Sequence, residues 1–143
     1  MREASEMVIV DSSVWIDFLN QRHTPQTHWL SASRSIDRVG VTMLVLAEVL
    51  QGIRLDSRFR RAEQFFRTMP VVDTLNYSLA VQAASSLRTL RTLGVSVRST
   101  VDCLIATLCI EAGHQLLHCD SDYDFFERYL NLTVLHPPPL PVP

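Results

Sequence analysis

Residues 7–19, MVIVDSSVWIDFL, contain a short apolar run that ends at an aspartate and continues into an amphipathic segment. The run MVIV before Asp11 is typical of a central strand in a parallel sheet, because such strands are buried on both faces. Ser12 or Ser13 can cap the helix that follows. Apolar residues at helical spacing mark the inner side of this helix: Val14, Trp15, Phe18 and Leu19. The stretch therefore predicts a strand and a helix with Asp11 at their junction.

The same alternation of short apolar runs and longer amphipathic segments continues along the chain. Further strands are expected at residues 38–41, 71–72, 115–119 and 132–135. Helices are expected at residues 26–35, 43–50, 54–69, 76–93, 101–112 and 125–130, with Thr42 and Thr100 as caps and Gly94 and Gly113 as stop signals. Strands that alternate with helices in this way form parallel sheets, so the predicted fold class is α/β.

The 143 residues, of which 47% are hydrophobic, are enough for one domain with a substantial core. We expect a single domain over residues 1–143, with a polar extension at 1–6 and an extended proline-rich tail at 137–143. The first residues do not resemble a secretory signal, and no apolar run reaches the roughly 20 residues of a membrane span. Cys103, Cys109 and Cys119 lack zinc-ligand spacing, so we expect buried reduced thiols in a cytoplasmic protein.

The net charge of −2 argues against a surface that simply binds polyanions. Every one of the 13 positive residues is an arginine, a side chain suited to bidentate phosphate contacts. The chain has 15 acidic residues, of which five are candidates for a shared cluster. The other ten are outnumbered by the 13 arginines. The rest of the molecule therefore carries an excess of positive charge, which is compatible with phosphate contacts.

Four acidic residues occur singly in segments that are otherwise apolar: Asp11, Glu48, Asp102 and Asp120. A carboxylate in an apolar setting is strongly unfavourable unless a partner compensates it. An arginine or a helix N-terminus can compensate one such residue, but a shared cation is the simplest explanation for four. Asp11 and Asp120 follow predicted strands, whose carboxyl ends meet at one edge of a parallel sheet. Asp102 lies in the first turn of its helix, where the helix dipole favours an anion.

Oxygen ligands without nitrogen or sulfur predict Mg²⁺, or Mn²⁺, rather than zinc. Ions of this kind, held by carboxylates and water, promote phosphodiester hydrolysis. Simpler interpretations stay open for single residues: Asp11 as a helix cap, Asp102 as an ordinary first-turn acid and Glu48 as a paired core acid. Asp122 and Asp124 are weaker candidates, because an acidic loop before a helix is common.

Four motifs, in order along the chain, resemble the PIN domain and more narrowly the VapC toxins of bacterial type II toxin–antitoxin pairs. They are VDSSVWIDFL at residues 10–19, LAEVLQGI at 46–53, RSTVDCLIA at 98–106 and LLHCDSDYDFF at 116–126, and the similarity covers residues 7–136. The resemblance implies a three-layer α/β/α sandwich with a mainly parallel central sheet. It also implies a homodimeric Mg²⁺-dependent endoribonuclease that cleaves structured RNA such as tRNA or rRNA loops. A cognate antitoxin would place its tail over the active-site groove.

The resemblance also assigns roles to individual residues. The four motifs align Asp11, Glu48, Asp102 and Asp120 with the catalytic acids and metal ligands of the family. Asp122 matches a further acid found in many members, and Ser13 matches a hydroxyl residue near the first aspartate that could contact substrate. Tyr123 departs from the family pattern, which usually has phenylalanine there, and we expect this departure to leave the metal ligands unaffected.

Arg98, four residues before Asp102, is a candidate for RNA contact, with Arg88 and Arg91 as alternatives. A response-regulator or phosphatase-like domain is disfavoured, because those families use a lysine to stabilise the phosphoryl group and this chain has none. A non-catalytic module that binds RNA or protein is disfavoured by four intact carboxylates. A PIN-like nuclease acting on DNA stays open, because nothing in the sequence recognises a 2′-hydroxyl.

Overall fold

A parallel four-stranded sheet forms the centre of the computed structural model, which describes residues 6–32, 38–72 and 75–142. Its strands are β1 (Val8–Val10), β2 (Val39–Gly40), β3 (Gln115–Leu117) and β4 (Thr133–Val134), in the order β2-β1-β3-β4. Every pair is parallel, and β1 lies between β2 and β3. All three residues of β1 are fully buried, as its continuous apolar sequence predicts. The α/β class with a parallel sheet is confirmed.

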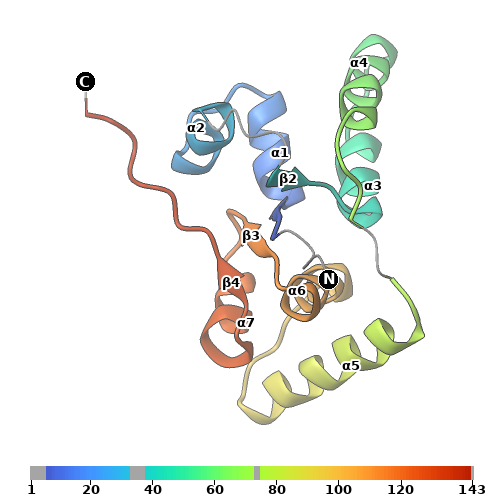
Figure 1. The fold of residues 1–143 in the computed structure, drawn as a ribbon, viewed down its shortest axis with the longest axis vertical. Coiled ribbons are helices and arrows are strands. Elements are labelled where there is room, and N and C mark those ends of the chain that lie inside the picture. Colours follow the sequence, from blue (N-terminus) through green and yellow to red (C-terminus); the bar gives the residue numbers. More distant parts are fainter. Residues whose placement is uncertain (1–5, 33–37, 73–74, 143) are drawn as a thin grey trace, which may run out of the picture.

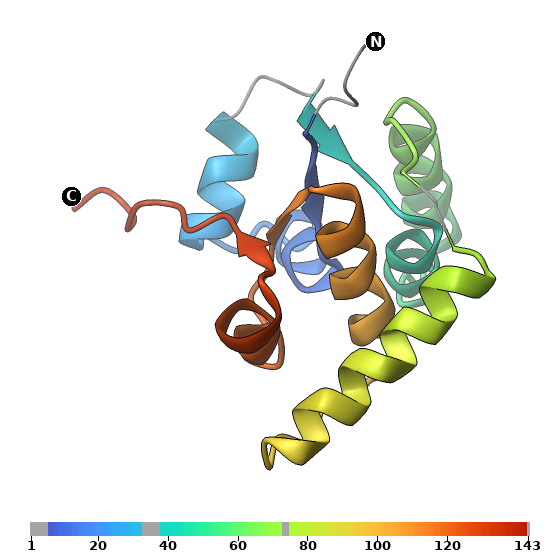
Figure 2. The same cartoon turned by 60° about the horizontal axis from the view of Figure 1, so that its bottom comes forward.

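Seven helices surround the sheet within the described residues. They are α1 (Ser12–Leu19), α2 (Pro25–Ala32), α3 (Met43–Gln51), α4 (Asp56–Arg67), α5 (Tyr77–Thr92), α6 (Thr100–Ala112) and α7 (Tyr123–Leu130). Helices α1 and α2 lie on one side of the sheet and α6 and α7 on the other, while α5 packs on the outer side of α6 (Figure 1). The turned view in Figure 2 shows the strands between these two groups. This is the three-layer arrangement that the resemblance implies.

Aromatic packing holds α1 against α4. The ring of Trp15, which is almost completely buried, meets three phenylalanine rings edge-on, with centroids 5.6 Å away for Phe18, 5.8 Å for Phe65 and 5.0 Å for Phe66. Edge-to-face pairs of this kind stabilise a core beyond the area that they bury. The first turn of α1, next to Asp11, is therefore anchored on its inner face.

Several elements begin at residues other than those expected. Asp11, not Ser12 or Ser13, is the N-cap of α1, and Ser99, not Thr100, is the N-cap of α6. Helix α7 begins at Tyr123, two residues earlier than expected. Residues 71–72 form only an isolated parallel bridge between Val71 and Val41. The expected helix at 26–35 is described as far as residue 32, and its last three positions lie outside the described residues.

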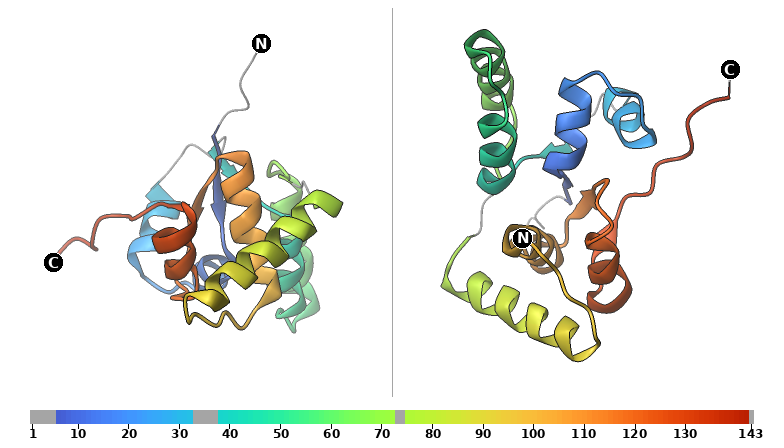
Figure 3. Two further views of the ribbon diagram at one scale, coloured as in Figure 1. Left: turned by 90° about the horizontal axis from the view of Figure 1, so that it is seen from below. Right: turned by 180° about the vertical axis from the view of Figure 1, so that it is seen from behind.

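The cysteines and the C-terminal tail differ in how well they were predicted. Cys103 and Cys109 are buried free thiols as expected, but Cys119 is exposed, because the strand ends at Leu117 before reaching it. The proline-rich residues 137–142 form neither helix nor strand and extend away from the body of the molecule (Figure 3). Among the described residues, no helix combines the length and the apolar character that a membrane span would require.

The glycine that ends α6 generates a first prediction. Gly113 has a φ of +73°, and a Cβ there would meet no atom within 4 Å, so backbone strain alone would penalise a side chain. We expect Gly113→Ala to lower the free energy of unfolding by about 1–2 kcal/mol in urea denaturation. Gly52→Ala is the control, because Gly52 has a helical φ of −84° and space for a Cβ. Equal losses in both variants would contradict the strain argument.

Candidate active site

The carboxyl edge of the sheet brings acidic residues from three parts of the chain together. Asp11 directly follows β1, and its backbone N–H donates to the Leu117 carbonyl of β3 at 2.9 Å. Asp120 lies three residues beyond the end of β3. Asp102 lies in the first turn of α6, where the Ser99 hydroxyl accepts from its N–H at 3.2 Å. Parallel pairing of β1 and β3 therefore places separate segments at one edge, as the sequence predicts.

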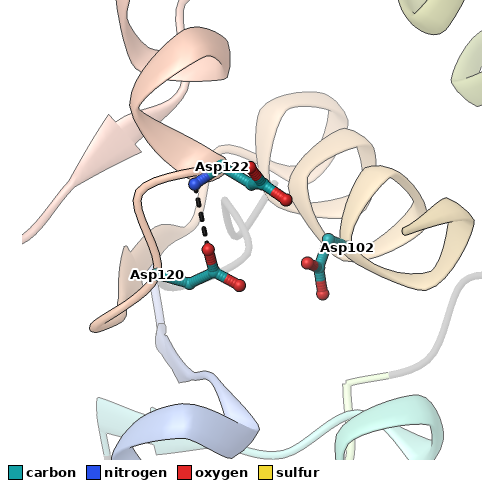
Figure 4. A group of neighbouring side chains, drawn as sticks. All are labelled: Asp102, Asp120 and Asp122. Carbon is teal, nitrogen blue, oxygen red and sulfur yellow. Dashed lines mark hydrogen bonds between the residues drawn. The ribbon is translucent and has the colours of Figure 1, made fainter. Parts of the chain in front are cut away.

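Three carboxylates at this edge, including one from Asp122, are close enough to share one cation. One oxygen from each of Asp102, Asp120 and Asp122 lies within 4.8 Å of the other two, and Figure 4 shows the three side chains converging from α6 and the β3–α7 turn. Oδ1 of Asp120 also accepts from the Asp122 N–H at 2.9 Å, which shapes this turn. Asp122, a weaker candidate in the sequence, is therefore part of the closest group of acids.

Asp11 is both a helix cap and a member of the acidic site. Its side chain is 2% exposed, and its Oδ2 accepts from the N–H and the hydroxyl of Ser13 at 3.1 and 2.7 Å. The Ser13 hydroxyl in turn accepts from the Cys119 N–H at 3.1 Å. Since its single proton goes to Asp11, Ser13 holds that carboxylate in place, and its contact with substrate stays a prediction.

The surroundings of Asp102 disfavour its charged form. Burial raises the pKa of its carboxyl to about 7, and the negative charges of Asp11 and Asp120 contribute to the rise. The side chain is 9% exposed. An ordinary first-turn acid is solvated and has no such neighbours, so the mutual repulsion points to a site that needs a counter-charge.

Glu48 has an unpartnered atom that faces inward. It lies in the middle of α3, and its Oε1 is buried with no hydrogen-bond partner among the described residues. Burial raises the pKa of Glu48, and the charge of Asp11 raises it further. A hydrogen bond from the Ser12 side chain lowers the pKa of Glu48, but no ion pair to Glu48 occurs within the described residues, so its interpretation as a paired core acid is met only in part.

Among residues 6–32, 38–72 and 75–142, no arginine forms an ion pair with the cluster. The salt bridges within the described residues join Arg22 to Asp17, Arg67 to Glu63 and His136 to Glu127, and none of them includes a cluster acid. The donor set is therefore carboxylate oxygen alone, together with the orphaned Oε1 of Glu48. These residues fit a hard divalent cation such as Mg²⁺ or Mn²⁺.

Tyr123 is the residue that the sequence analysis misjudged. Its hydroxyl donates to Oδ1 of Asp11 at 2.8 Å and lies 3.2 Å from Oδ1 of Asp102, so this departure from the family pattern does contact the acidic site. Burial and the two carboxylates raise the pKa of Tyr123, so it stays a donor. The signal available in the sequence was the helical spacing of Tyr123 and Phe126, both fully buried on the inner face of α7.

The arginines proposed to contact substrate are exposed. Arg98 directly precedes the N-cap Ser99, so it lies at the same end of α6 as Asp102, and it forms no ion pair in the described part of the chain. Arg88 and Arg91 lie further back on α5. Of the three, Arg98 has the position closest along the chain to the acidic site.

The raised pKa of Asp102 predicts how stability depends on pH without metal. The folded protein keeps a proton on this carboxyl up to about pH 7, whereas the unfolded chain releases it near 3.8. The free energy of unfolding in EDTA should therefore fall as pH rises between these values. We expect Asp102→Asn to remove this component and to be more stable than the parent at pH 8 by roughly 1–3 kcal/mol in urea denaturation.

Asp56→Asn is the matched control, because Asp56 is an exposed acid in the first turn of another helix, α4. The free energy of unfolding of Asp56→Asn in EDTA should change with pH in the same way as that of the parent. The same pH dependence in Asp102→Asn as well would show that Asp102 is not destabilised by its neighbours.

Comparisons with known proteins agree with this architecture. A family model described as the PIN domain matches residues 8–129. Two curated relatives, VapC ribonuclease Mb1587 of Mycobacterium bovis and ribonuclease VapC11 of Mycobacterium tuberculosis, are each 30% identical over 133 residues. Each alignment covers 88% of this chain and 96% of the relative.

Solved structures share the fold at lower identity. VapBC2 from Rickettsia felis, solved with a promoter DNA fragment, aligns with a TM-score of 0.69 at 17% identity over 90% of this chain and 97% of that one. FitAcB from Neisseria gonorrhoeae aligns with a TM-score of 0.68 at 17% identity over 92% and 98%. The matched family model spans β1 to α7 and so includes every acidic residue of the site, and the chain belongs to the PIN domain family.

Proposed function

We propose that this protein is a Mg²⁺-dependent endoribonuclease and the toxin of a bacterial type II toxin–antitoxin pair. The observation that carries the proposal is the convergence of Asp102, Asp120 and Asp122 within 4.8 Å, with no ion pair to an arginine of the described part of the chain. Two relatives that are 30% identical to this chain are named VapC ribonuclease and ribonuclease VapC11, which supports RNA as the substrate. One buried and two half-buried carboxylates that repel one another destabilise the fold and are suited to binding a divalent cation.

Five residues would hold or orient the cation: Asp11, Glu48, Asp102, Asp120 and Asp122. A bound Mg²⁺, or Mn²⁺ in its place, supplies a Lewis acid toward phosphate and lowers the pKa of water. The unpartnered Oε1 of Glu48 is available to accept a hydrogen bond from the attacking water. Asp11, held by Ser13 and Tyr123, keeps a fixed carboxylate beside Asp102. The bond between phosphorus and the 3′ oxygen breaks on the side opposite the attacking water, and the 3′ oxygen takes a proton from solvent.

The proposed substrate is a structured RNA with an exposed loop, such as tRNA or rRNA. An unpaired loop is easier to place in a groove than a duplex, because its bases are already unstacked. Arg98 is the arginine that we propose contacts the RNA backbone, since it adjoins the N-terminal end of α6 beside Asp102. Such RNA is cytoplasmic, and we propose the same location for the protein.

A cognate antitoxin and a second copy of the chain are the proposed protein partners. A mostly apolar cavity of about 400 Å³ lies between α1 and the α3–α4 segment, with Ile16, Val49, Leu55 and Arg58 in its lining. An antitoxin segment with apolar side chains and an acidic group would fit this lining. Tyr77 and Val81, which are exposed and one turn apart on α5, are the proposed contact of the homodimer. Its mass in solution would be twice the 16.2 kDa of one chain.

Cleavage of RNA tests the activity. Purified parent should cut total RNA in Mg²⁺ and not in EDTA. Asp11→Asn and Asp102→Asn should each reduce the cleavage rate at least about 100-fold, because losing a metal ligand costs more activity than losing a residue that only orients one. Asp56→Asn should cleave like the parent. Cleavage that persists in EDTA, or in either cluster variant, would defeat the proposal.

A pair of oligonucleotides with one loop sequence, made as RNA and as DNA, separates the substrate classes in the same assay. The proposal requires cleavage of the RNA form. Cleavage of the DNA form alone identifies a DNA nuclease, and binding without cleavage of either form identifies a non-catalytic module.

Metal binding should stabilise the folded protein by mass action. At a Mg²⁺ concentration of about 100 times Kd, the parent gains roughly 2.7 kcal/mol, which a rise in Tm reports. We expect a smaller rise in Asp102→Asn and an unchanged rise in Asp56→Asn. Equal rises in the parent and in Asp102→Asn would place the ion elsewhere.

A further inference from the structure

The hydroxyl of Tyr123 lies between two acidic residues from different parts of the fold. It is 2.8 Å from Oδ1 of Asp11, which follows β1, and 3.2 Å from Oδ1 of Asp102, in the first turn of α6. A phenol has a single proton, so one donor faces two carboxylate oxygens. No other hydrogen bond to either oxygen occurs within the described residues. The Tyr123 hydroxyl is therefore the direct hydrogen-bonding link between the two carboxylates.

Packing fixes the position of this hydroxyl. Tyr123 has no exposed surface, and its ring centroid lies 4.9 Å from that of His118 and 6.5 Å from that of Phe126. Its backbone N–H donates to the Asp120 carbonyl at 3.2 Å, at the start of α7. The ring cannot move without disturbing the turn that carries Asp120, so the hydroxyl is held independently of the carboxylates that it contacts.

Asp11 is not one of the three acids whose oxygens lie within 4.8 Å of one another. Its Oδ2 is occupied by Ser13, so its contact with the rest of the cluster runs through Oδ1 and the Tyr123 hydroxyl. Without that hydroxyl, Oδ1 of Asp11 would be a buried acceptor that has lost its partner and that repels Asp102. Tyr123 is thus the hydrogen-bonded link between the β1 carboxylate and the α6 carboxylate.

We propose that Tyr123 is a positioning residue whose hydroxyl holds Asp11 and Asp102 in the arrangement that a divalent cation requires. The inference rests on the proposed function, because it takes both residues as metal ligands. Groups that orient ligands contribute strongly to affinity although they do not touch the metal. Removing the hydroxyl should therefore weaken metal binding more than it slows the reaction once metal is bound.

Tyr123→Phe removes one oxygen and keeps the buried ring. Mn²⁺ and Mg²⁺ binding are measured by calorimetry on parent and variant, well below the Tm of each in EDTA. We expect the variant to bind about tenfold more weakly. The metal concentration that gives half-maximal RNA cleavage should rise by the same factor, while the rate at saturating metal changes much less. Tyr129→Phe is the control, because it removes the same hydroxyl from a half-exposed tyrosine on the same helix.

A double-mutant cycle shows whether the hydroxyl acts through Asp11. The stabilities of the parent, Tyr123→Phe, Asp11→Asn and the double variant are measured in EDTA, and the two effects should be non-additive. Additive effects, or unchanged or tighter metal binding in Tyr123→Phe, would overturn the positioning role alone. A parent that binds no metal would overturn the proposed function as well, so the two failures are distinguishable.

Discussion

The parallel pairing of β1 with β3 is the constraint on which the acidic site depends. The register joins Val10 to Leu117, and the N–H of Asp11 extends it by donating to the Leu117 carbonyl. This pairing makes Asp11 and the turn at residues 118–122 leave the sheet at the same edge. All three residues of β1 are buried, so this pairing lies in the centre of the core and fixes the position of the acidic edge relative to it.

Packing and electrostatics oppose each other in this molecule. The carboxylates of Asp102, Asp120 and Asp122 crowd together, and burial, with the charges of Asp11 and Asp120, raises the pKa of Asp102. Core packing offsets this electrostatic destabilisation. It includes the contacts of the Trp15 ring on α1 and the buried face of α7. Clusters of like charges lower the stability of the fold, and such clusters are typical of functional sites, where the residues are needed for binding or catalysis.

The sequence predicted the α/β class, the parallel sheet and the gathering of acids, because each depends on patterns that run over many residues. Local choices were less predictable. Ser99 and Thr100 are adjacent hydroxyl residues that can each cap a helix, and only the backbone, extended at Ser99, decides between them. The start of α7 depends on the turn that the Asp120 side chain forms, and this turn places Tyr123 inside the protein. The spacing of Tyr123 and Phe126 indicates that both face inward on one helix, but the polar stretch DSDYD does not show that the Tyr123 hydroxyl reaches Asp11 and Asp102.

The hydrogen bonds that define the site join residues very far apart in the chain. Ser13 and Cys119 are 106 positions apart, and Tyr123 and Asp11 are 112 positions apart. Contacts of such long range form late in folding, because the intervening chain must first lose its freedom. While the protein is being synthesised, β1 leaves the ribosome long before β3 and α7 exist. The proposed site is therefore complete only after β3 and α7, with Asp120 and Asp122 between them, have been made.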